Sequence, residues 1–212
     1  MPLDTALHKS AKDGDVQECL EALRSGVAVN APGAQGRTAL HRALGGGFSE
    51  CARTLIASGA DPLISDAMKR TALHWAVLGT GNGVMACVEL LFAADLVPQM
   101  VNVPSKSKST PLHCAISAGR EDIAVLLLQK GGADPNLLDE DDKSCRALAK
   151  AAGMKLFDRE VTALRRSSSS ASSGSGGSTK RSSADGGTKR GFFNMRRSSR
   201  RSAPAKEDWV KL

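Results

Sequence analysis

The side chains of this chain that are best suited to chemistry are four histidines and five cysteines. His113 and Cys114 are adjacent in the sequence, and together with Cys87 they could form a metal site or a Cys–His nucleophile. The sequence has no C-x-x-C or H-x-x-x-H spacing, no G-x-S-x-G motif and no glycine-rich phosphate loop after a strand. We therefore expect structural roles for these residues, with no metal, no cofactor and no enzymatic activity.

Each histidine ends a tetrapeptide that recurs along the chain. Thr-Ala-Leu-His begins at Thr5, Thr38 and Thr71, at intervals of 33 residues, and Thr-Pro-Leu-His begins at Thr110 after 39 more. A Thr hydroxyl is a good helix N-cap, and Ala or Pro suits the first helical position. Leu would face inward, and His can bond back across the turn. The tetrapeptide predicts the start of a helix, four times.

Glycines keep the same register. One set lies nine residues after the Thr, or after Ser144, that opens each unit: Gly14, Gly47, Gly119 and Gly153. Another set lies 21 residues after the Thr, where glycine would close a second helix in the left-handed conformation: Gly26, Gly59 and Gly131. With this period and tetrapeptide the chain resembles the ankyrin-repeat family, whose unit is a turn followed by two antiparallel helices. The resemblance implies an all-α solenoid of helix pairs joined by short β-hairpin-like loops. The composition of the C-terminal part predicts a disordered tail.

The register also predicts the domain organisation. We expect an ankyrin-repeat domain at residues 4–164, with units 5–37, 38–70, 71–109 and 110–143 and a degenerate capping unit at 144–164. Residues 165–188 are rich in Ser and Gly and read as a disordered linker, and residues 189–212 as a basic disordered tail. Unit three exceeds the 33-residue period by six residues. We assign the excess to the turn at 79–83 and the loop at 94–101, and such insertions often map to a binding face.

The resemblance implies that the protein binds a partner through the hairpin tips and the exposed, concave face of the first helices. The corresponding candidates are Gln35, Arg37, Met68, Lys69, Arg70, Leu78, Lys106, Lys108, Asp139, Glu140 and Asp141. Small residues on the first helices, including Gly45 and Gly46, would let a partner's backbone approach closely. Trp75 is interpreted as inter-helix packing, with a partner-binding anchor as the alternative. Solvated charges at the tips are the simpler alternative for the whole set.

The tail holds most of the positive charge. Residues 165–212 contain 12 Lys or Arg and 3 Asp or Glu, a net charge of +9, whereas the remaining residues sum to −2. Its basic cluster comprises Lys189, Arg190, Arg196, Arg197, Arg200 and Arg201. A nuclear address, binding to anionic membrane or calmodulin-like binding, and binding to nucleic acid all remain open, as does an inert solvated tail.

Three serines in the tail, Ser168, Ser183 and Ser199, follow pairs of basic residues and are candidates for phosphorylation. Three phosphates would add about −5 to −6 of charge and weaken any contact with an anionic surface. The last residues, Trp209 to Leu212, could also add as a strand to a PDZ-type domain.

The resulting prediction is a monomeric, non-enzymatic scaffold or adaptor that binds a protein partner of unknown identity. The alternative is a tail-driven binder of anionic membrane or nucleic acid, with the repeats as a rigid support. The five cysteines fall at positions that usually pack inward, and residues 1–15 contain no apolar run. We therefore expect a reducing compartment, the cytoplasm or the nucleus.

Overall fold

The computed structural model describes residues 4–157. Within that range the chain forms helices and no strand, apart from an isolated antiparallel bridge between Leu138 and Ser144. The α-helices are α1 (Ala6–Asp13), α2 (Val16–Arg24), α3 (Ala39–Gly46), α4 (Ser49–Ala57), α5 (Ala72–Leu78), α6 (Val84–Ala93), α7 (Pro111–Ser117), α8 (Glu121–Gln129) and α9 (Cys145–Ala151). Two short 3-10 helices, η1 (Ala34–Gly36) and η2 (Val97–Gln99), lie in loops.

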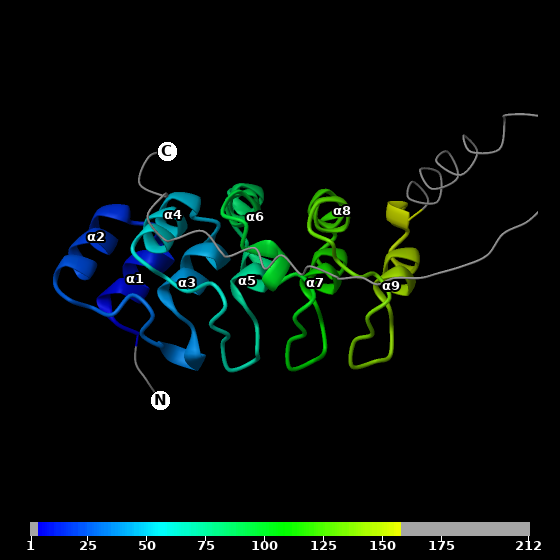
Figure 1. Cartoon of the computed structure of the whole chain (residues 1–212), viewed down its shortest axis with the longest axis horizontal. Coiled ribbons are helices and arrows are strands. Elements are labelled where there is room, and N and C mark those ends of the chain that lie inside the picture. Colours follow the sequence, from blue (N-terminus) through cyan, green and yellow to red (C-terminus); the bar gives the residue numbers. More distant parts are fainter. Residues whose placement is uncertain (1–3, 158–212) are drawn as a thin grey trace, which may run out of the picture. The chain divides into compact units, whose positions relative to one another are not determined.

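The helices form two parallel layers, and the loops between repeats project from one side (Figure 1). The first helices α1, α3, α5, α7 and α9 pack in sequence against one another, and α2, α4 and α6 pack in a second row. In the first four repeats, each first helix also packs against the second helix of its own repeat. The all-α solenoid predicted from the sequence is therefore confirmed over the described residues.

The four tetrapeptides begin helices in the same way. Thr5, Thr38, Thr71 and Thr110 are N-cap residues with extended backbone, and each forms a capping box with the histidine three residues later. The Nδ1 atom of that histidine accepts a hydrogen bond from the threonine backbone N–H, at 3.0–3.2 Å. The fifth repeat lacks the histidine, and the Ser144 hydroxyl alone accepts from the backbone N–H of Ala147.

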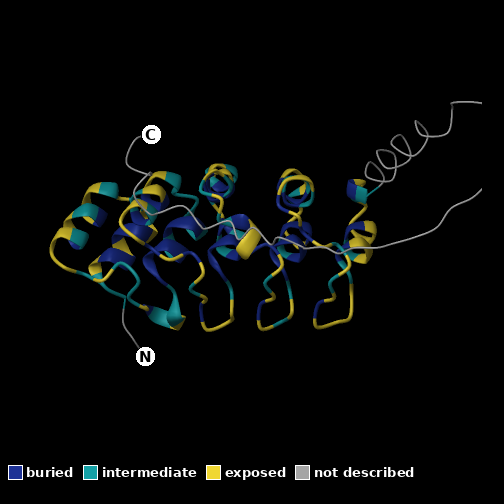
Figure 2. Ribbon diagram, in the orientation of Figure 1, coloured by how far each residue is buried: buried dark blue, intermediate teal, exposed yellow. Residues whose placement is uncertain are grey.

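The core lies between the two layers (Figure 2). The leucine of each tetrapeptide is fully buried, as predicted: Leu7, Leu40, Leu73 and Leu112. Cysteines and leucines of the second helices meet them from the other layer, including Cys19, Cys51, Leu55, Cys87, Leu91 and Leu127. Because each helix pair buries little surface by itself, stability comes from the contacts between repeats.

Two details differ from the sequence prediction. The left-handed residue after α8 is Gly132, with φ of 70°, and not Gly131, because the chain continues one residue further before it turns. The insertion at 94–101 is not a free loop either. It forms η2 and buries Val97, Met100 and Val101 in the core, since these three side chains are apolar and face the helices of the repeat.

Candidate functional site

The loops between repeats end in four similar turns, which we call the hairpin tips (residues 34–37, 67–70, 106–109 and 140–143). Each turn is closed by the same backbone hydrogen bond. The donor N–H belongs to the residue five positions before the next N-cap, and the acceptor carbonyl belongs to the residue directly before that N-cap. The pairs are Gly33 to Arg37, Asp66 to Arg70, Ser105 to Ser109 and Asp139 to Lys143, at 2.8–3.1 Å. The turns are therefore rigid local structures.

Neighbouring hairpin tips are also joined to one another. Ala67 donates its backbone N–H to the carbonyl of Gln35 at 2.9 Å, and Lys106 donates to Met68 at 2.8 Å. Glu140 donates to the carbonyl of Ser107 at 3.1 Å. One hydrogen bond per repeat thus holds the tips in a continuous row, and their side chains keep a fixed spacing.

Lysine occupies an unusual backbone conformation in two of these tips. Lys69 and Lys108, each two residues before the next N-cap, have φ of 57° and 55°. Gly36 and Asp142 hold the equivalent places in the first and fourth tips, with φ of 70° and 56°. A left-handed conformation costs a residue other than glycine about 1–2 kcal/mol. The two lysines therefore stand where glycine would fold more easily.

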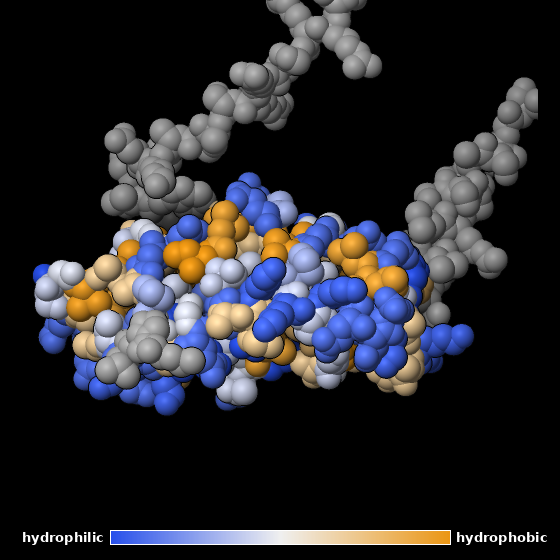
Figure 3. Space-filling view, turned by 90° about the horizontal axis from the view of Figure 1, so that it is seen from below, coloured by the Kyte–Doolittle hydropathy of each residue, from blue (hydrophilic) through white to orange (hydrophobic). Residues whose placement is uncertain are grey.

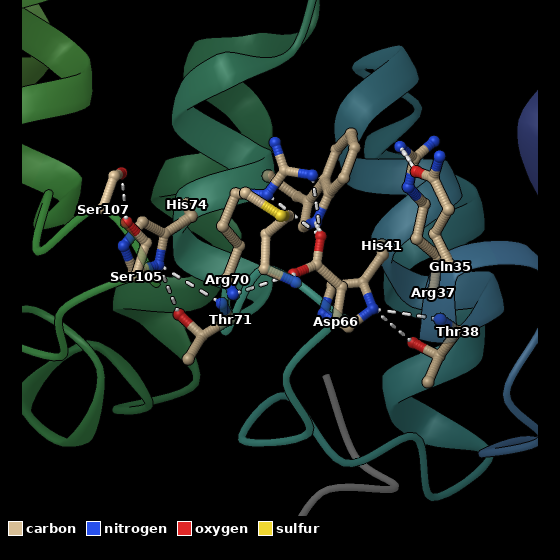
Figure 4. Close-up of polar contacts among 12 residues, drawn as sticks. Gln35, Arg37, Thr38, His41, Asp66, Arg70, Thr71, His74, Ser105 and Ser107 are labelled. Carbon is tan, nitrogen blue, oxygen red and sulfur yellow. Dashed lines mark hydrogen bonds and ion pairs between the residues drawn. The ribbon is translucent and has the colours of Figure 1, made fainter.

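A group of charged and aromatic side chains connects the first two hairpin tips to helix α5 (Figure 4). Asp66 lies at its centre and is almost fully buried. Its carboxylate accepts a hydrogen bond from the indole Nε1 of Trp75 at 3.1 Å and forms an ion pair with Arg70 at 2.9 Å. The guanidinium carbons of Arg70 and Arg37 lie 4.4 and 4.6 Å from the centre of the Trp75 ring.

The electrostatics of this group keep Asp66 ionised. Burial alone would raise the pKa of Asp66, but hydrogen bonds from the backbone and side chain of Arg70, the positive charge of Arg70 and the backbone N–H of Met68 together lower it. For Arg37, burial and then the positive charges of Arg42 and Arg70 lower the pKa. Arginine nevertheless stays protonated at neutral pH.

A shallow groove of about 280 Å³ lies beside this group, between the second and third hairpin tips. Met68, Leu78 and Cys114 provide apolar lining, and Arg70 provides a positive edge. The remaining lining residues are Ser105, Ser107, Ser109, His113 and Ser117. The groove is large enough for a side chain of a bound chain and small for most ligands of enzymes.

Three of the four histidine rings hydrogen-bond to the backbone of neighbouring loops. The Nε2 atoms of His8, His74 and His113 bond to the carbonyls of Arg37, Ser109 and Lys143 in the next loop, at 3.0–3.3 Å. The ring of His41 lies beside the backbone of Ile64 instead. Within residues 4–157, no three His, Cys, Asp or Glu side chains are grouped as metal ligands would be.

The structure gives the predicted partner-binding residues different environments. Seven of them are exposed: Gln35, Met68, Lys69, Lys106, Lys108, Glu140 and Asp141. Arg37, Arg70 and Leu78 are half-buried. Asp139 is buried, and its carboxylate accepts from the backbone N–H groups of Asp141 and Lys143 within its own loop. It shapes the tip, and we leave it out of the candidate surface.

Three interpretations of single residues need correction or refinement. The space above Gly45 is filled by Trp75, since a Cβ there would lie 2.9 Å from the indole, and Phe48 occupies the space above Gly46. These glycines therefore accommodate aromatic side chains of the protein itself and leave no room for a partner's backbone. Cys114 is half-buried and lines the groove, whereas the other four cysteines are buried.

Sequence reasoning did not anticipate the group around Asp66, because its members come from two loops and a helix. A usable signal was present: Asp66 and Asp139 both lie five residues before the next N-cap. The predicted basic cluster (Lys189, Arg190, Arg196, Arg197, Arg200 and Arg201) and the phosphorylation candidates (Ser168, Ser183 and Ser199) lie outside the described residues. Among the helices that are described, none is long and apolar enough to cross a membrane.

Comparison with known proteins gives a family match over most of the described chain. A family model described as ankyrin repeats (3 copies) matches residues 3–66 and 59–139. The chain is 35% identical over 123 residues to the probable 26S proteasome regulatory subunit p28 of Saccharomyces cerevisiae, covering 58% of this chain and 52% of that protein. It is also 35% identical over 130 residues to the neurogenic locus notch homolog protein 1 of Danio rerio, covering 61% of this chain and 5% of that protein.

A third relative is the nuclear factor NF-kappa-B p105 subunit of Mus musculus, which is 30% identical over 136 residues, covering 62% of this chain and 13% of that protein. The chain thus spans about half the length of the yeast subunit and small parts of the other two. What these proteins share with the chain is the repeat array.

Proposed function

Because the chain belongs to the ankyrin-repeat family, we propose that it is a non-enzymatic adaptor that binds a protein partner through its hairpin tips and the adjoining face of its first helices. Ankyrin repeats generally mediate protein–protein interaction, and the family is typically non-enzymatic. One observation carries the proposal for this chain. The tips are joined by backbone hydrogen bonds into a row that keeps exposed cations and Met68 at fixed positions.

Rigidity matters here because association is more favourable when the binding surface is already ordered. Figure 3 shows the face with the hairpin tips, and hydrophilic side chains cover most of it, with smaller apolar patches between them. Such a mixed surface is typical of interfaces that form and dissociate. The proposed site of action is the cytoplasm or the nucleus.

The proposal is tested by pull-down with the full chain. The Lys69→Glu/Lys106→Glu double variant reverses two charges in the hairpin tips, and a Lys12→Glu/Lys130→Glu double variant reverses two exposed charges elsewhere. We expect the first variant to lose the proteins that the wild type retains and the second to keep them. Equal retention by both variants would exclude the hairpin tips as the binding surface.

Salt dependence separates this function from the alternative, in which the basic tail binds anionic membrane or nucleic acid. Binding through many phosphate contacts falls steeply between low and high salt, whereas an interface with apolar contacts weakens far less. We expect retention by the repeats to persist at 0.5 M NaCl, about three times the physiological ionic strength. Complete loss at that concentration, with no effect of the tip variants, would favour the tail.

A further inference from the structure

Three arginines lie near the first two hairpin tips, and two of them have carboxylate partners. Arg42 pairs with Asp4 at 2.7 Å, and Arg70 pairs with Asp66 at 2.9 Å. Arg37 forms no ion pair with any carboxylate within residues 4–157, and its guanidinium hydrogen-bonds only the side-chain oxygen of Gln35. Asp66 and Asp4 act on the charge of Arg37 electrostatically, but neither forms an ion pair with it.

The position of Arg37 is nevertheless fixed. Its guanidinium stacks on Trp75, and its Nε atom is buried without a hydrogen-bond partner in the described part of the chain. Arg70 stacks on the same indole, so that two cations are held close together around one ring. Asp66 balances one of these charges. An anionic group of a bound molecule would balance the charge of Arg37 and would bind a guanidinium that is already ordered.

The groove provides a second contact next to this cation. Arg70 takes part in both features, because it stacks on Trp75 and also lines the groove with Met68 and Leu78. Exposed lysines flank the groove on both tips, namely Lys69, Lys106 and Lys108. A ligand that reaches from Arg37 into the groove would thus present negative charge and one apolar side chain.

We propose that the surface formed by Arg37, Trp75, Arg70 and the adjoining groove binds an acidic segment of the partner, with one carboxylate at Arg37 and one large apolar side chain between Met68, Leu78 and Cys114. This inference rests on the proposed function and names the chemistry of the partner. The carboxylate fits because a planar guanidinium binds it with two parallel hydrogen bonds.

The next hairpin tip limits the length of that acidic segment. Glu140, Asp141 and Asp142 are exposed one repeat beyond Lys106 and Lys108, with Lys143 as their neighbouring cation. Long polyanions such as nucleic acids would meet these carboxylates and be repelled. A peptide with a short acidic stretch avoids them, so the arrangement favours a protein partner.

Selection from random peptides tests the inference directly, because it lets the surface choose its own ligand chemistry. Random dodecapeptides displayed on phage are selected on the full chain, and the most enriched peptide is synthesised with a fluorescent label and titrated by anisotropy. We expect enriched peptides to combine two or more Asp or Glu with one large apolar residue. Arg37→Gln should weaken binding of the labelled peptide at least about tenfold, as loss of a charge-assisted hydrogen bond predicts.

Arg53→Gln is the matched control, since Arg53 is an exposed arginine on α4 whose nearest carboxylate, Glu50, is also exposed. It should leave the affinity within twofold. Both variants retain the whole basic tail, so a difference between them does not arise from the tail. If Arg37→Gln lowers the folded fraction, the peptide itself is changed, and replacing its Asp and Glu by Asn and Gln should weaken binding to the wild type by a similar factor.

Neutral or basic enriched peptides, or an affinity that is insensitive to both Arg37→Gln and the amide peptide, would overturn the inference, as would a failure to enrich any peptide. The result also distinguishes the two proposals. Neutral peptides whose binding is lost in Lys69→Glu/Lys106→Glu would leave the hairpin tips as the interface and reject only the acidic partner. Peptides insensitive to every tip variant would reject both.

Discussion

The imidazole of His74 donates from Nε2 to the carbonyl oxygen of Ser109, 35 residues later, at 3.1 Å. Its other nitrogen, Nδ1, accepts from the backbone N–H of Thr71 at 3.2 Å. One ring therefore caps the helix of its own repeat and fixes the loop that leads to the next. This pattern requires a neutral imidazole with its proton on Nε2, because a protonated ring has no acceptor for the threonine N–H.

The first prediction concerns pH. Burial lowers the pKa of both His41 and His74 to about 4. In the unfolded chain these imidazoles bind protons below about pH 6.5, whereas in the folded chain they stay neutral to about pH 4. The contribution of these two histidines to the unfolding free energy is therefore fully present above pH 6.5. It is lost as the pH is lowered from 6.5 to 4, at about 3 kcal/mol for each histidine. Urea unfolding at a series of pH values measures it.

A double variant provides the control for that measurement. His41→Gln/His74→Gln should be less stable at pH 7.5 but should show a flatter pH dependence between 6.5 and 4. Carboxylates such as Asp66, whose pKa is lowered, act in a separate window, since their contribution is lost only as the pH falls below about 4. An equally steep loss in wild type and variant between pH 6.5 and 4 would show that other groups control it.

The second prediction tests the register of the repeats. Leu40 and Leu73 are almost completely buried, and Leu→Ala at such positions costs about 2–5 kcal/mol of unfolding free energy. Leu63 has 45% of its surface exposed, and Leu63→Ala should change stability by no more than about 0.5 kcal/mol. Thermal and urea unfolding of the three variants compares the same chemical change at buried and exposed sites. Similar midpoints for all three would mean that the assigned register is wrong.

The repeated parts of the fold could be predicted because the same residues recur at the same offsets. Leu7, Leu40, Leu73 and Leu112 occupy one position of the unit, so each copy supports the assignment of the others. Where the chain departs from the repeat, prediction failed. Gly132 and not Gly131 takes the left-handed conformation, and the insertion at 94–101 contributes Val97 and Met100 to the core. Nothing in the repeat pattern specifies how added residues pack.

The candidate site was predicted as a list of tip residues, but not as an arrangement. Arg37 and Trp75 are 38 residues apart, and Asp66 contacts both Arg70 of its own loop and Trp75 of helix α5. Their contact depends on how far one loop leans over the next helix, which sequence periodicity does not give. Gly45 illustrates the same limit, because its role becomes clear only when Trp75 is seen to pack above it.

The third prediction concerns cysteine reactivity. Burial is the main cause of a raised thiol pKa in four cysteines. The pKa rises to about 11 for Cys87 and Cys114. It rises to about 12 for Cys51 and Cys145. The thiolate is the reactive form, so a pKa of about 11 in place of 9 lowers its fraction at pH 8 about a hundredfold. We expect iodoacetamide to alkylate the folded protein slowly, and mass spectrometry measures the extent of alkylation at each cysteine. Cys114 should react first, because it alone of the five is half-buried.

Unfolding in urea serves as the control for alkylation and should make all five thiols react at similar rates. A bound partner that fills the groove should protect Cys114 without changing the others. Rapid labelling of Cys51 or Cys87 in the folded protein would contradict the buried positions of the second-helix cysteines.

The fourth prediction compares Asp66 with Asp139, which hold equivalent positions five residues before the next N-cap. Both carboxylates accept two backbone N–H groups of their own tip, but only Asp66 also accepts from Trp75 and pairs with Arg70. Asp66→Ala leaves a half-buried arginine without its partner and should cost about 3 kcal/mol. Asp139→Ala removes an acceptor from two neutral backbone donors and should cost about 1–2 kcal/mol.

Urea unfolding measures both losses of unfolding free energy. The affinity for the selected peptide is a second measurement, which a loss of stability alone does not change while the protein remains folded. Without Asp66, Arg70 and the indole of Trp75 lose the contact that orients them, so the platform under Arg37 is disturbed. Asp66→Ala should therefore weaken peptide binding even under conditions where the variant is fully folded. Asp139→Ala should leave binding unchanged, because its contacts stay within the acidic tip. Equal effects of the two variants on binding would mean that the Asp66 network supports the hairpin only, and that Arg37 keeps its place without it.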